Sequence, residues 1–280
     1  MITPAQAAHI KARAYVPEQV PAYVTAISKM EPFLLGDFVA YANRERLILV
    51  GYPLSERFNP DRLARALDEA RLQFNPNVVS VTAPGTPAVW ADWAQSPADS
   101  YYRLDLNTLS ISQKLRHMLR RAGREVTVSQ VDRFGREHQK LIKDFRRARP
   151  LDKATQAIFS QIPDYVRTDT ARIFEARNGR DDLIAFDVAE FGARHYAFYM
   201  FNFRSRQRYV PGASDLLLSK IIEQARIEDK QYLNLGLGIN PGVTFFKTKW
   251  GAVPFLAHIA CWRQEPARGS LWQDIFDSLL

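Results

Sequence analysis

The sequence predicts an α+β protein made of two successive units, each combining a mixed sheet with flanking helices. Segments with helical spacing of apolar residues alternate with short apolar runs typical of strands, such as Leu47–Val50. The pair Asn178-Gly179, between two such runs, is a strong signal for a β-hairpin. A chain of 280 residues, 46% of them hydrophobic, can bury the core of one large or two medium domains.

The first unit is predicted to begin with helices and strands in alternation. The segment Pro21–Met30 is predicted to complete a first amphipathic helix. Two strands follow within residues 32–54 and are joined by a polar turn at Asn43–Glu45. Asn59-Pro60 matches a helix N-cap followed by proline at the first helical position, and apolar spacing carries that helix to about Gln73. The remaining elements of this unit are strands at Asn77–Thr82 and Tyr101–Leu106, separated by a long loop at Ala83–Ser100.

The second unit starts near Asn107 and has more elements. Its predicted helices are Ser110–Gly123, Asp132–Arg147, Ala154–Val166, Gly212–Ile227 and Pro241–Trp250. Its predicted strands are Val126–Val128, Ala171–Ala176, Leu183–Glu190, His195–Phe203, Tyr232–Gly236 and Phe255–Trp262. The tail from Ser270 is predicted to be helical.

The net charge of +8 is concentrated in one segment, between Ile111 and Arg149. Four acids stand there against twelve basic residues, and twelve minus four equals the charge of the whole chain. The basic residues are Lys114, Arg116, Arg120, Arg121, Arg124, Arg133, Arg136, Lys140, Lys143, Arg146, Arg147 and Arg149. Such a block suits a polyanion such as tRNA, a nucleotide or an anionic lipid head group, and a solvated face on two surface helices is an equally good interpretation.

Composition also bears on the compartment. Cys261 is the single cysteine, so no intrachain disulfide can form, as is usual in a reducing compartment. The first residues lack the apolar region of a signal peptide, and no stretch approaches the ~18–20 apolar residues of a membrane span. We therefore expect a cytoplasmic protein without a transmembrane segment.

Two motifs near the end of the second unit carry a family resemblance. They are RYVPGASDLLLSKIIEQARIEDKQYLNLG, residues 208–236, and GINPGVTFFKTKWG, residues 238–251. Their order resembles the GNAT acyltransferase domains of Fem-like aminoacyltransferases: a turn into a helix, a strand with L-x-L-G, and a helix ending in FK-x-K-W-G. The earlier helix SQKLRHMLRRAGREVTV is similar to the one that opens these domains, so the resemblance covers about Ser110 to Phe255. The first half resembles, more loosely, the C-terminal domain group of phosphatidylglycerol lysyltransferases.

The resemblance implies a tandem GNAT architecture, with an N-terminal GNAT-like domain at 1–106 and a C-terminal GNAT acyltransferase domain at 107–280. It implies transfer of an acyl or aminoacyl group to an amine or hydroxyl by direct attack, without a tightly bound cofactor. The donor is aminoacyl-tRNA in Fem-like enzymes and acyl-CoA in ordinary GNAT enzymes. The acceptor is expected to be a small molecule or a cell-envelope precursor. One departure disfavours acetyl-CoA: Pro211 stands in the phosphate-binding turn, where it removes a backbone N–H.

One residue expected to act in catalysis lies in a matching motif, and the others lie mainly on the two strands that precede it. Lys247 corresponds to the lysine of the FK pair, so the resemblance implies positive charge for the developing oxyanion or the leaving ribose oxygen. The resemblance also makes Tyr199 and Tyr209 candidate general acids, and Glu190 and Asp187 on the neighbouring strand are candidate bases. The alternative interpretations are that Lys247 is an ordinary surface lysine and that the strand residues only pack in the core.

A second set of residues is expected to bind the donor or substrate. Free N–H groups at the start of a helix bind anions, and alternating arginines after a strand share a face if the extended chain continues. The donor or substrate set is Arg204, Arg206, Arg208, Tyr209, Gly212, Ala213, Ser214, Phe246 and Trp250, and the polyanion set is Arg116, Arg120, Arg121 and Arg124. The alternatives are helix capping by Ser214 and core packing by Trp250.

Other sequence signals are weaker. His195 and His258 have no second ligand at metal spacing, so no metal site is expected. Gly236-Leu237-Gly238 lacks the third glycine of a dinucleotide loop, and we interpret these glycines as places where the chain passes closely over an acyl site. An acyl-CoA-dependent acetyltransferase and a non-catalytic binding module on the same scaffold remain the competing hypotheses.

Overall fold

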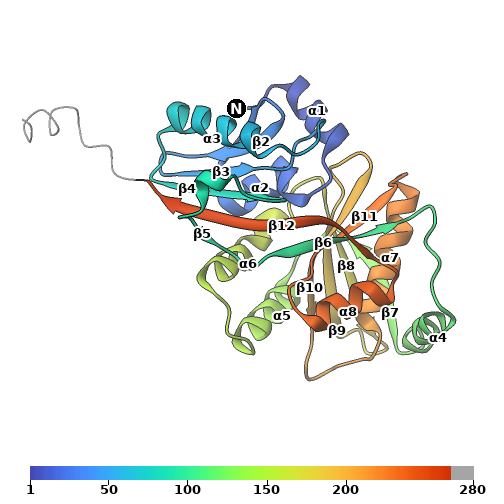
Figure 1. Ribbon diagram of the computed structural model, residues 1–280. Coiled ribbons are helices and arrows are strands. Elements are labelled where there is room, and N and C mark those ends of the chain that lie inside the picture. The colour runs from blue at the N-terminus through green and yellow to red at the C-terminus, as the bar shows by residue number, and fades with distance from the viewer. Residues whose placement is uncertain (266–280) are drawn as a thin grey trace, which may run out of the picture.

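The computed structural model describes residues 1–265, and two sheets in it are joined through one long strand, β12 (Figure 1). The strand order runs β1-β2-β3-β4-β12-β6-β11-β10-β9-β8-β7, and β5 pairs with β12 beside this path. Early strands are β1 (Glu31–Leu35), β2 (Phe38–Ala42), β3 (Arg46–Val50), β4 (Val78–Ala83), β5 (Ala94–Gln95) and β6 (Asp99–Asp105). Later strands are β7 (Val126–Val131), β8 (Ala171–Asn178), β9 (Leu183–Glu190), β10 (Tyr196–Arg204), β11 (Tyr232–Leu237) and β12 (Val253–Gln264).

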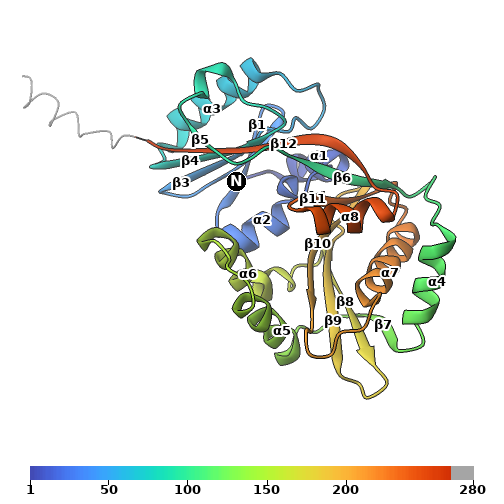
Figure 2. The ribbon, with the colours of Figure 1, turned by 60° about the horizontal axis from the view of Figure 1, so that its bottom comes forward.

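Helices cover both sheets (Figure 2). Those of the first half are α1 (Pro4–Arg13), η1 (Pro17–Gln19), α2 (Pro21–Ser28), α3 (Pro60–Phe74) and η2 (Ala88–Trp90). Those of the second half are α4 (Gln113–Ala122), α5 (Arg136–Arg147), α6 (Lys153–Tyr165), α7 (Ala213–Ile227) and α8 (Pro241–Lys249). The α+β class with mixed sheets and flanking helices is as predicted.

Strand β12 belongs to both sheets. Its first part pairs with β6, from Val253↔Arg103 to His258↔Asp99, and its second part pairs with β4, from Ile259↔Ala83 to Gln264↔Val78. Strand β6, in turn, pairs with β11. The division at 106/107 remains our proposal for the domain boundary.

Most predicted elements occur, with differences in the first half. Residues 31–50 hold three strands instead of two, because Gly36 adopts a φ of +57° and closes a tight turn between β1 and β2. Helix α1 was not predicted, although Thr3 and Gln6 form a capping box at its start. The expected loop 83–100 contains the short elements η2 and β5. The predicted helix from Ser270 lies outside the described residues.

The sheet of the second half has different helices on its two faces. Neighbouring residues of a strand point to opposite faces, so Phe174 of β8 packs under α7 whereas Ile173 packs under α5 and α6. Leu115 of α4 packs in the core on the same face of the sheet as α7. The β8–β9 hairpin predicted from Asn178-Gly179 is present, with its strands in antiparallel register.

Candidate active site

The sheet opens between β10 and β11. The two parallel strands pair only from Tyr196↔Tyr232 to Phe198↔Asn234. Beyond these positions β10 continues along β9 and β11 continues along β6, so within residues 1–265 the facing edges have no strand partner. Unpaired backbone N–H groups at such an edge are free to bind the oxygen of a carbonyl group. We call this place the β10–β11 opening.

Asn234 fixes the shape of β11 at the opening. Its side-chain amide is fully buried, donates to the carbonyl of Tyr15 at 2.9 Å and accepts from the N–H of Gly236 at 2.8 Å. Gly236 adopts a φ of +76°, a conformation that favours glycine. A Cβ atom at this position would lie 3.8 Å from Nζ of Lys247 and 3.9 Å from the carbonyl oxygen of Tyr199. The lysine and the edge of β10 therefore line the same small space.

Lys247 of α8 reaches the opening from outside the sheet. Only 3% of the residue is exposed, which is unusual for lysine, and its Nζ donates to the carbonyl of Leu237. Burial lowers the pKa of Lys247 to about 7, and the carboxylate of Asp99 offsets part of this effect. Its side chain also lies beneath the ring of Tyr102, with Nζ 5.7 Å from the ring centroid. The interpretation of Lys247 as an ordinary surface lysine is thereby wrong.

Asp99 holds the loop that connects β11 to α8. Its carboxylate accepts from the N–H groups of Ser100, Gly238 and Ile239 at 2.7, 3.0 and 2.8 Å. Burial alone would raise the pKa of Asp99, but these N–H donors outweigh burial and keep the pKa below its ordinary value. A Cβ at Gly238 would lie only 2.7 Å from this carboxylate, so the close approach requires glycine.

A buried polar cluster lies on the α7 side of the opening. The β10–β9 register shifts between Tyr199 and Phe201, and this bulge turns Asn202 to the same face as Tyr199. Asn202 donates to Oδ1 of Asp187, and its Nδ2 lies 3.2 Å from the hydroxyl of Ser214 at the start of α7. Oδ2 of Asp187 is buried without a hydrogen-bond partner in the described part of the chain.

Burial governs the protonation of this cluster. Asp187 is fully buried, and desolvation raises its pKa to about 8 although Asn202 and Tyr199 lower it. The pKa of Tyr199 lies well above its ordinary value, first because of burial and then because of Asp187. At neutral pH both groups are therefore mainly protonated and can serve as proton donors.

The aromatic residues of α8 differ in position. Phe246 stacks with Tyr199, with ring centroids 6.1 Å apart, so it lies beside the opening. Trp250 is buried and its indole N–H donates to Asp215 at 2.9 Å, which gives it a role in the core. Lys249 forms an ion pair with the same carboxylate at 2.7 Å and thus points away from Lys247, as its helical spacing predicts.

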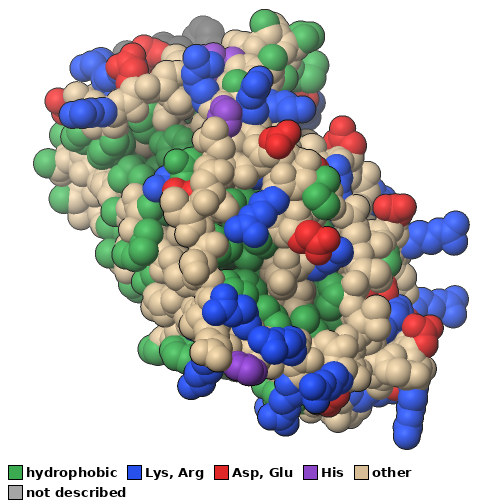
Figure 3. Space-filling model, turned by 90° about the vertical axis from the view of Figure 1, so that its right-hand side faces the viewer, with side chains coloured by type: hydrophobic (Ala, Val, Ile, Leu, Met, Phe, Trp, Pro, Cys, Tyr) green, Lys and Arg blue, Asp and Glu red, His purple; other side chains and the backbone are tan. Residues whose placement is uncertain are grey.

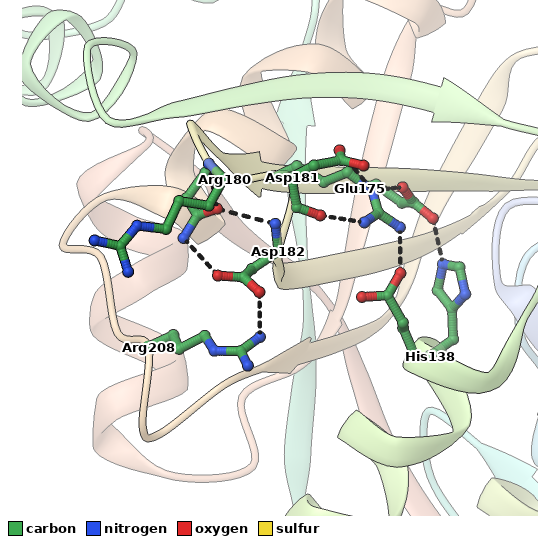
Figure 4. A network of polar contacts seen from close by, with 9 residues as sticks. His138, Glu175, Arg180, Asp181, Asp182 and Arg208 are labelled. Carbon is green, nitrogen blue, oxygen red and sulfur yellow. Dashed lines mark hydrogen bonds and ion pairs between the residues drawn. The ribbon is translucent and has the colours of Figure 1, made fainter.

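The turn before α7 carries the predicted donor-binding arginines. The strand ends at Arg204, so the expectation that Arg204, Arg206 and Arg208 share one face is wrong. Arg204 lies over the ring of Tyr209, at 5.0 Å from its centroid, whereas Arg206 is exposed. Arg208 points to Asp182 of the β8–β9 turn, at 3.0 Å, within a polar network that also holds Arg180 and Asp181 (Figure 4).

The start of α7 offers free N–H groups beside this turn. Gly212 is the N-cap with a φ of +88°, and the buried Ala213 donates its N–H to the carbonyl of Val210. The N–H groups of Ser214 and Asp215 have no acceptor within residues 1–265. Ser214 does not cap the helix, because its hydroxyl lies against Asn202.

Helix α4 extends the positive surface from this turn. A Cβ at Gly212 would lie 3.0 Å from Cβ of Ala122, so the C-terminal end of α4 abuts the start of α7. Arg116, Arg120, Arg121 and Arg124 are all exposed there. Lys and Arg side chains gather over the lower part of the molecular face on which α4 lies (Figure 3).

Glu190 lies on the other face of the sheet from Tyr199 and the buried polar cluster. Its neighbour Ala189 packs under α7, so Glu190 points to the opposite face. There it is fully buried, accepts from the hydroxyl of Tyr165 at 2.8 Å and from the N–H of Gly192 at 2.7 Å. Burial raises the pKa of Glu190.

Residues 1–265 contain no group of three or more His, Cys, Asp or Glu side chains placed to hold a metal ion. None of their helices combines the length and apolar character that crossing a bilayer requires.

The fold is similar to several solved structures. The C-terminal domain of a putative lysylphosphatidylglycerol synthetase from Agrobacterium fabrum has 14% sequence identity and a TM-score of 0.61, with 98% of this chain and 95% of that chain covered. FemX has 12% identity and a TM-score of 0.58, covering 92% and 96% of the two chains. A tandem GNAT protein from the clavulanic acid biosynthesis pathway has 14% identity and a TM-score of 0.53, covering 93% and 92%.

These similarities establish the fold. No family model matches the sequence, and no curated protein matches it either. The chain has a GNAT-like fold of the Fem-like type, in the arrangement also seen in tandem GNAT proteins.

Two residues of the site were not found by sequence reasoning. Asn234 lies within the LNLG motif without being a predicted site residue, and Asp99 lies in the segment 83–100 that is predicted to be a loop. Asn234 carried a signal, because an amide between two leucines of a buried strand needs hydrogen-bond partners. Asp99 had no comparable signal, since its partners Gly238 and Ile239 lie about 140 residues away.

Proposed function

We propose that this protein is an acyltransferase that moves an aminoacyl group from aminoacyl-tRNA to the amine, or hydroxyl, of an acceptor by direct attack. The reaction takes place at the β10–β11 opening. The observation that carries the proposal is Lys247, a buried lysine with a pKa of about 7 beside the free edge of β10. Perturbed ionisable groups at such openings are typical of catalytic sites.

The geometry supports a simple sequence of steps. The carbonyl oxygen of the donor lies against the free N–H groups of β10, and the acceptor nitrogen attacks the carbonyl carbon to form a C–N bond. The charge of protonated Lys247 stabilises the resulting oxyanion. The bond to the ribose oxygen then breaks, Tyr199 gives that oxygen a proton, and Tyr199 regains a proton from the new ammonium group.

The turn before α7 and its surroundings support aminoacyl-tRNA as the donor. Pro211 lacks an N–H, and Arg208 is engaged by Asp182, so the turn offers fewer phosphate ligands than one with an N–H and a free arginine at these positions. The arginines of α4 continue the positive surface, which favours a donor longer than a nucleotide. The fold is similar to that of FemX and of a putative lysylphosphatidylglycerol synthetase, and the latter name, which contains a lysyl group, agrees with aminoacyl transfer.

For the acceptor, we propose only its chemical class. A small molecule, a cell-envelope precursor or an anionic lipid head group would each present a nucleophile to the opening. We also propose a cytoplasmic location, because the single, buried Cys261 suits a reducing compartment.

The test is transfer of radiolabelled amino acids from a pool of aminoacyl-tRNAs to a panel of amines, with acyl-CoA donors assayed in parallel. Lys247→Met keeps the volume of the buried side chain but removes its charge, and we expect at least a 100-fold loss of kcat. Lys11→Met, at an exposed position of α1, is the matched control and should retain activity. Equal activity of both variants would remove Lys247 from the mechanism.

The parallel assays with aminoacyl-tRNA and with acyl-CoA distinguish the proposed function from the competing hypotheses. Turnover with acyl-CoA and none with aminoacyl-tRNA would replace the proposed donor. Binding of a donor without transfer to any acceptor would favour a binding module on the same scaffold.

A further inference from the structure

The basic segment of the chain is divided between two faces of a sheet. Helix α4 packs with α7 on one face, whereas Leu141 and Ile142 of α5 pack on the other face together with α6. Strand β7, which follows α4 and precedes α5, is the edge strand of the sheet. The cations of α5 therefore do not surround the turn before α7, and they call for a separate explanation.

Four of these cations form one continuous stripe. They are spaced by four, three and four residues, so they share the helix face that points away from Leu141 and Ile142. The members of this α5 stripe are Arg136, Lys140, Lys143 and Arg147, and all four are exposed. With a rise of ~1.5 Å per residue, the stripe is about 16 Å long.

The α5 stripe lacks the acids that usually balance a solvated helix. None of its four residues forms an ion pair within the described part of the chain. Glu137 is bound to Arg177 at 2.8 Å, and Asp144 pairs with neither Lys140 nor Arg147. Like charges one turn apart destabilise a helix by roughly 0.2–0.5 kcal/mol per pair, so a bound anion would relieve the repulsion.

A hollow adjoins the stripe between α5 and α6. It has a volume of about 350 Å³ and is lined by Lys143, Arg146, Arg147 and Gln156. Gln156 already donates its amide to the carbonyl of Leu151 at 2.9 Å, which leaves its oxygen as an acceptor. Three cations and one acceptor around a hollow of about ten water volumes suit a phosphate with its attached sugar.

We infer that the α5 stripe and this hollow bind the phosphate backbone of a folded RNA, and that this RNA is the body of the tRNA donor. A membrane is disfavoured because the large hydrophobic side chains exposed on the described residues lie outside α5 and α6, so nothing there inserts into a bilayer. The proposed contact depends on the charge of the RNA backbone and not on the nucleotide sequence. The identity of the RNA as donor rests on the proposed function, whereas the binding itself does not.

The binding test uses labelled, uncharged tRNA and fluorescence anisotropy between 50 and 200 mM salt. One variant changes Arg136, Lys140, Lys143 and Arg147 to Gln. A control variant changes Arg44, Arg46, Arg57 and Arg65 of the first half to Gln, which removes the same charge from exposed positions. The α5 variant should bind at least about tenfold more weakly, and its salt slope should fall by about one unit for each cation that touches phosphate.

The inference is overturned if the α5 variant binds tRNA like wild type, or if the control variant loses as much affinity. Sedimentation with vesicles of phosphatidylglycerol is a further arm. Loss of vesicle binding in the α5 variant, with unchanged tRNA binding, would assign the stripe to a membrane.

Transfer assays separate this inference from the proposed function. A short aminoacylated hairpin carries only the acceptor stem and lacks the tRNA body that we propose contacts α5. The α5 variant should show a raised KM with full-length tRNA and an unchanged KM with the hairpin. If no transfer occurs with either donor while tRNA binding depends on the stripe, the proposed function fails and the RNA surface stands.

Discussion

The buried amide of Asn234 holds the N–H of Gly236 at 2.8 Å, and this bond sets the course of β11 where it leaves β10. The same side chain donates to Tyr15, so the segment after α1 is tied to the opening. We expect Asn234→Ala to lower the free energy of unfolding by about 1–3 kcal/mol, because two buried groups lose their partner. Urea unfolding measures this change, and an unchanged midpoint would show that water replaces the amide.

A side chain at Gly236 is expected to abolish transfer activity, because it would occupy the space beside Lys247. Gly236→Ala places a Cβ between Lys247 and the carbonyl of Tyr199 and also forces alanine into a left-handed conformation. Gly36→Ala is the matched control, because Gly36 has a φ of +57° and open space around it. Both variants should lose about 1–2 kcal/mol of stability, but only Gly236→Ala should lose transfer activity. Equal activity of the two would mean that the acyl group does not occupy this space.

The buried charge of Lys247 predicts a pH-dependent stability. Its pKa falls from 10.5 to about 7 on folding, so between these values the unfolded chain binds more protons and stability rises with pH. Lys247→Met removes this rise. The stability of Lys247→Met relative to wild type should therefore be greatest below pH 7 and shrink by a few kcal/mol toward pH 10, at about 1.4 kcal/mol per unit of pKa shift.

Urea unfolding at pH 6, 8 and 10 measures this difference, in which other titrating groups cancel. A constant difference across the range would show that Lys247 titrates normally in the folded protein.

Asp187 predicts the opposite dependence. Its pKa rises from 3.8 to about 8 on folding, so the folded protein holds the extra proton and loses stability as pH rises between these values. Asp187→Asn mimics the protonated form. The variant should gain stability relative to wild type from pH 5 to pH 8, by an amount of order 1 kcal/mol per pH unit.

Thermal unfolding of the two proteins at pH 5, 6.5 and 8 tests this expectation. Identical pH profiles would mean that Asp187 is ionised and paired in the folded state.

Asp182 is expected to restrain Arg208. Asp182→Asn weakens an ion pair between half-exposed groups, so its effect on stability should stay below about 1 kcal/mol. The guanidinium becomes available to a phosphate of the donor, and donor affinity should rise several-fold. Arg208→Gln should lower the affinity, and the double variant should match Arg208→Gln. An Asp182→Asn protein with unchanged donor affinity would remove Arg208 from the donor site.

Local signals in the sequence were sufficient for much of the fold. The N-cap at Asn59 and the hairpin at Asn178 depend on neighbouring residues, and both are confirmed. The buried position of Lys247 agrees with the FFKTKWG motif, although its catalytic role stays a prediction. The three-strand meander at 31–50 was missed because Gly36 alone marks its first turn.

The remaining features depend on distant contacts. Tyr199 to Phe203 is nearly continuous in apolar and aromatic residues, so no alternation marks the bulge that turns Asn202 toward Asp187. Strand β9 also lacks alternation, so the sequence does not show to which face of the sheet Glu190 points. In the structure, the pairing of β9 with β8 and β10 turns Glu190 to the face that α6 covers. The arginines after β10 were expected on one extended face, but the turn that starts at Ser205 ends the strand first.

The long strand β12 also constrains when the protein can fold. The edge of β4 is paired by residues 259–264, about 180 positions later in the chain. On the ribosome, the strands β1 to β4 therefore emerge early, but the edge of β4 stays open until residues 259–264 have been synthesised. We expect nascent chains that end before β12 to expose that edge, and to depend on chaperones until the last strand arrives.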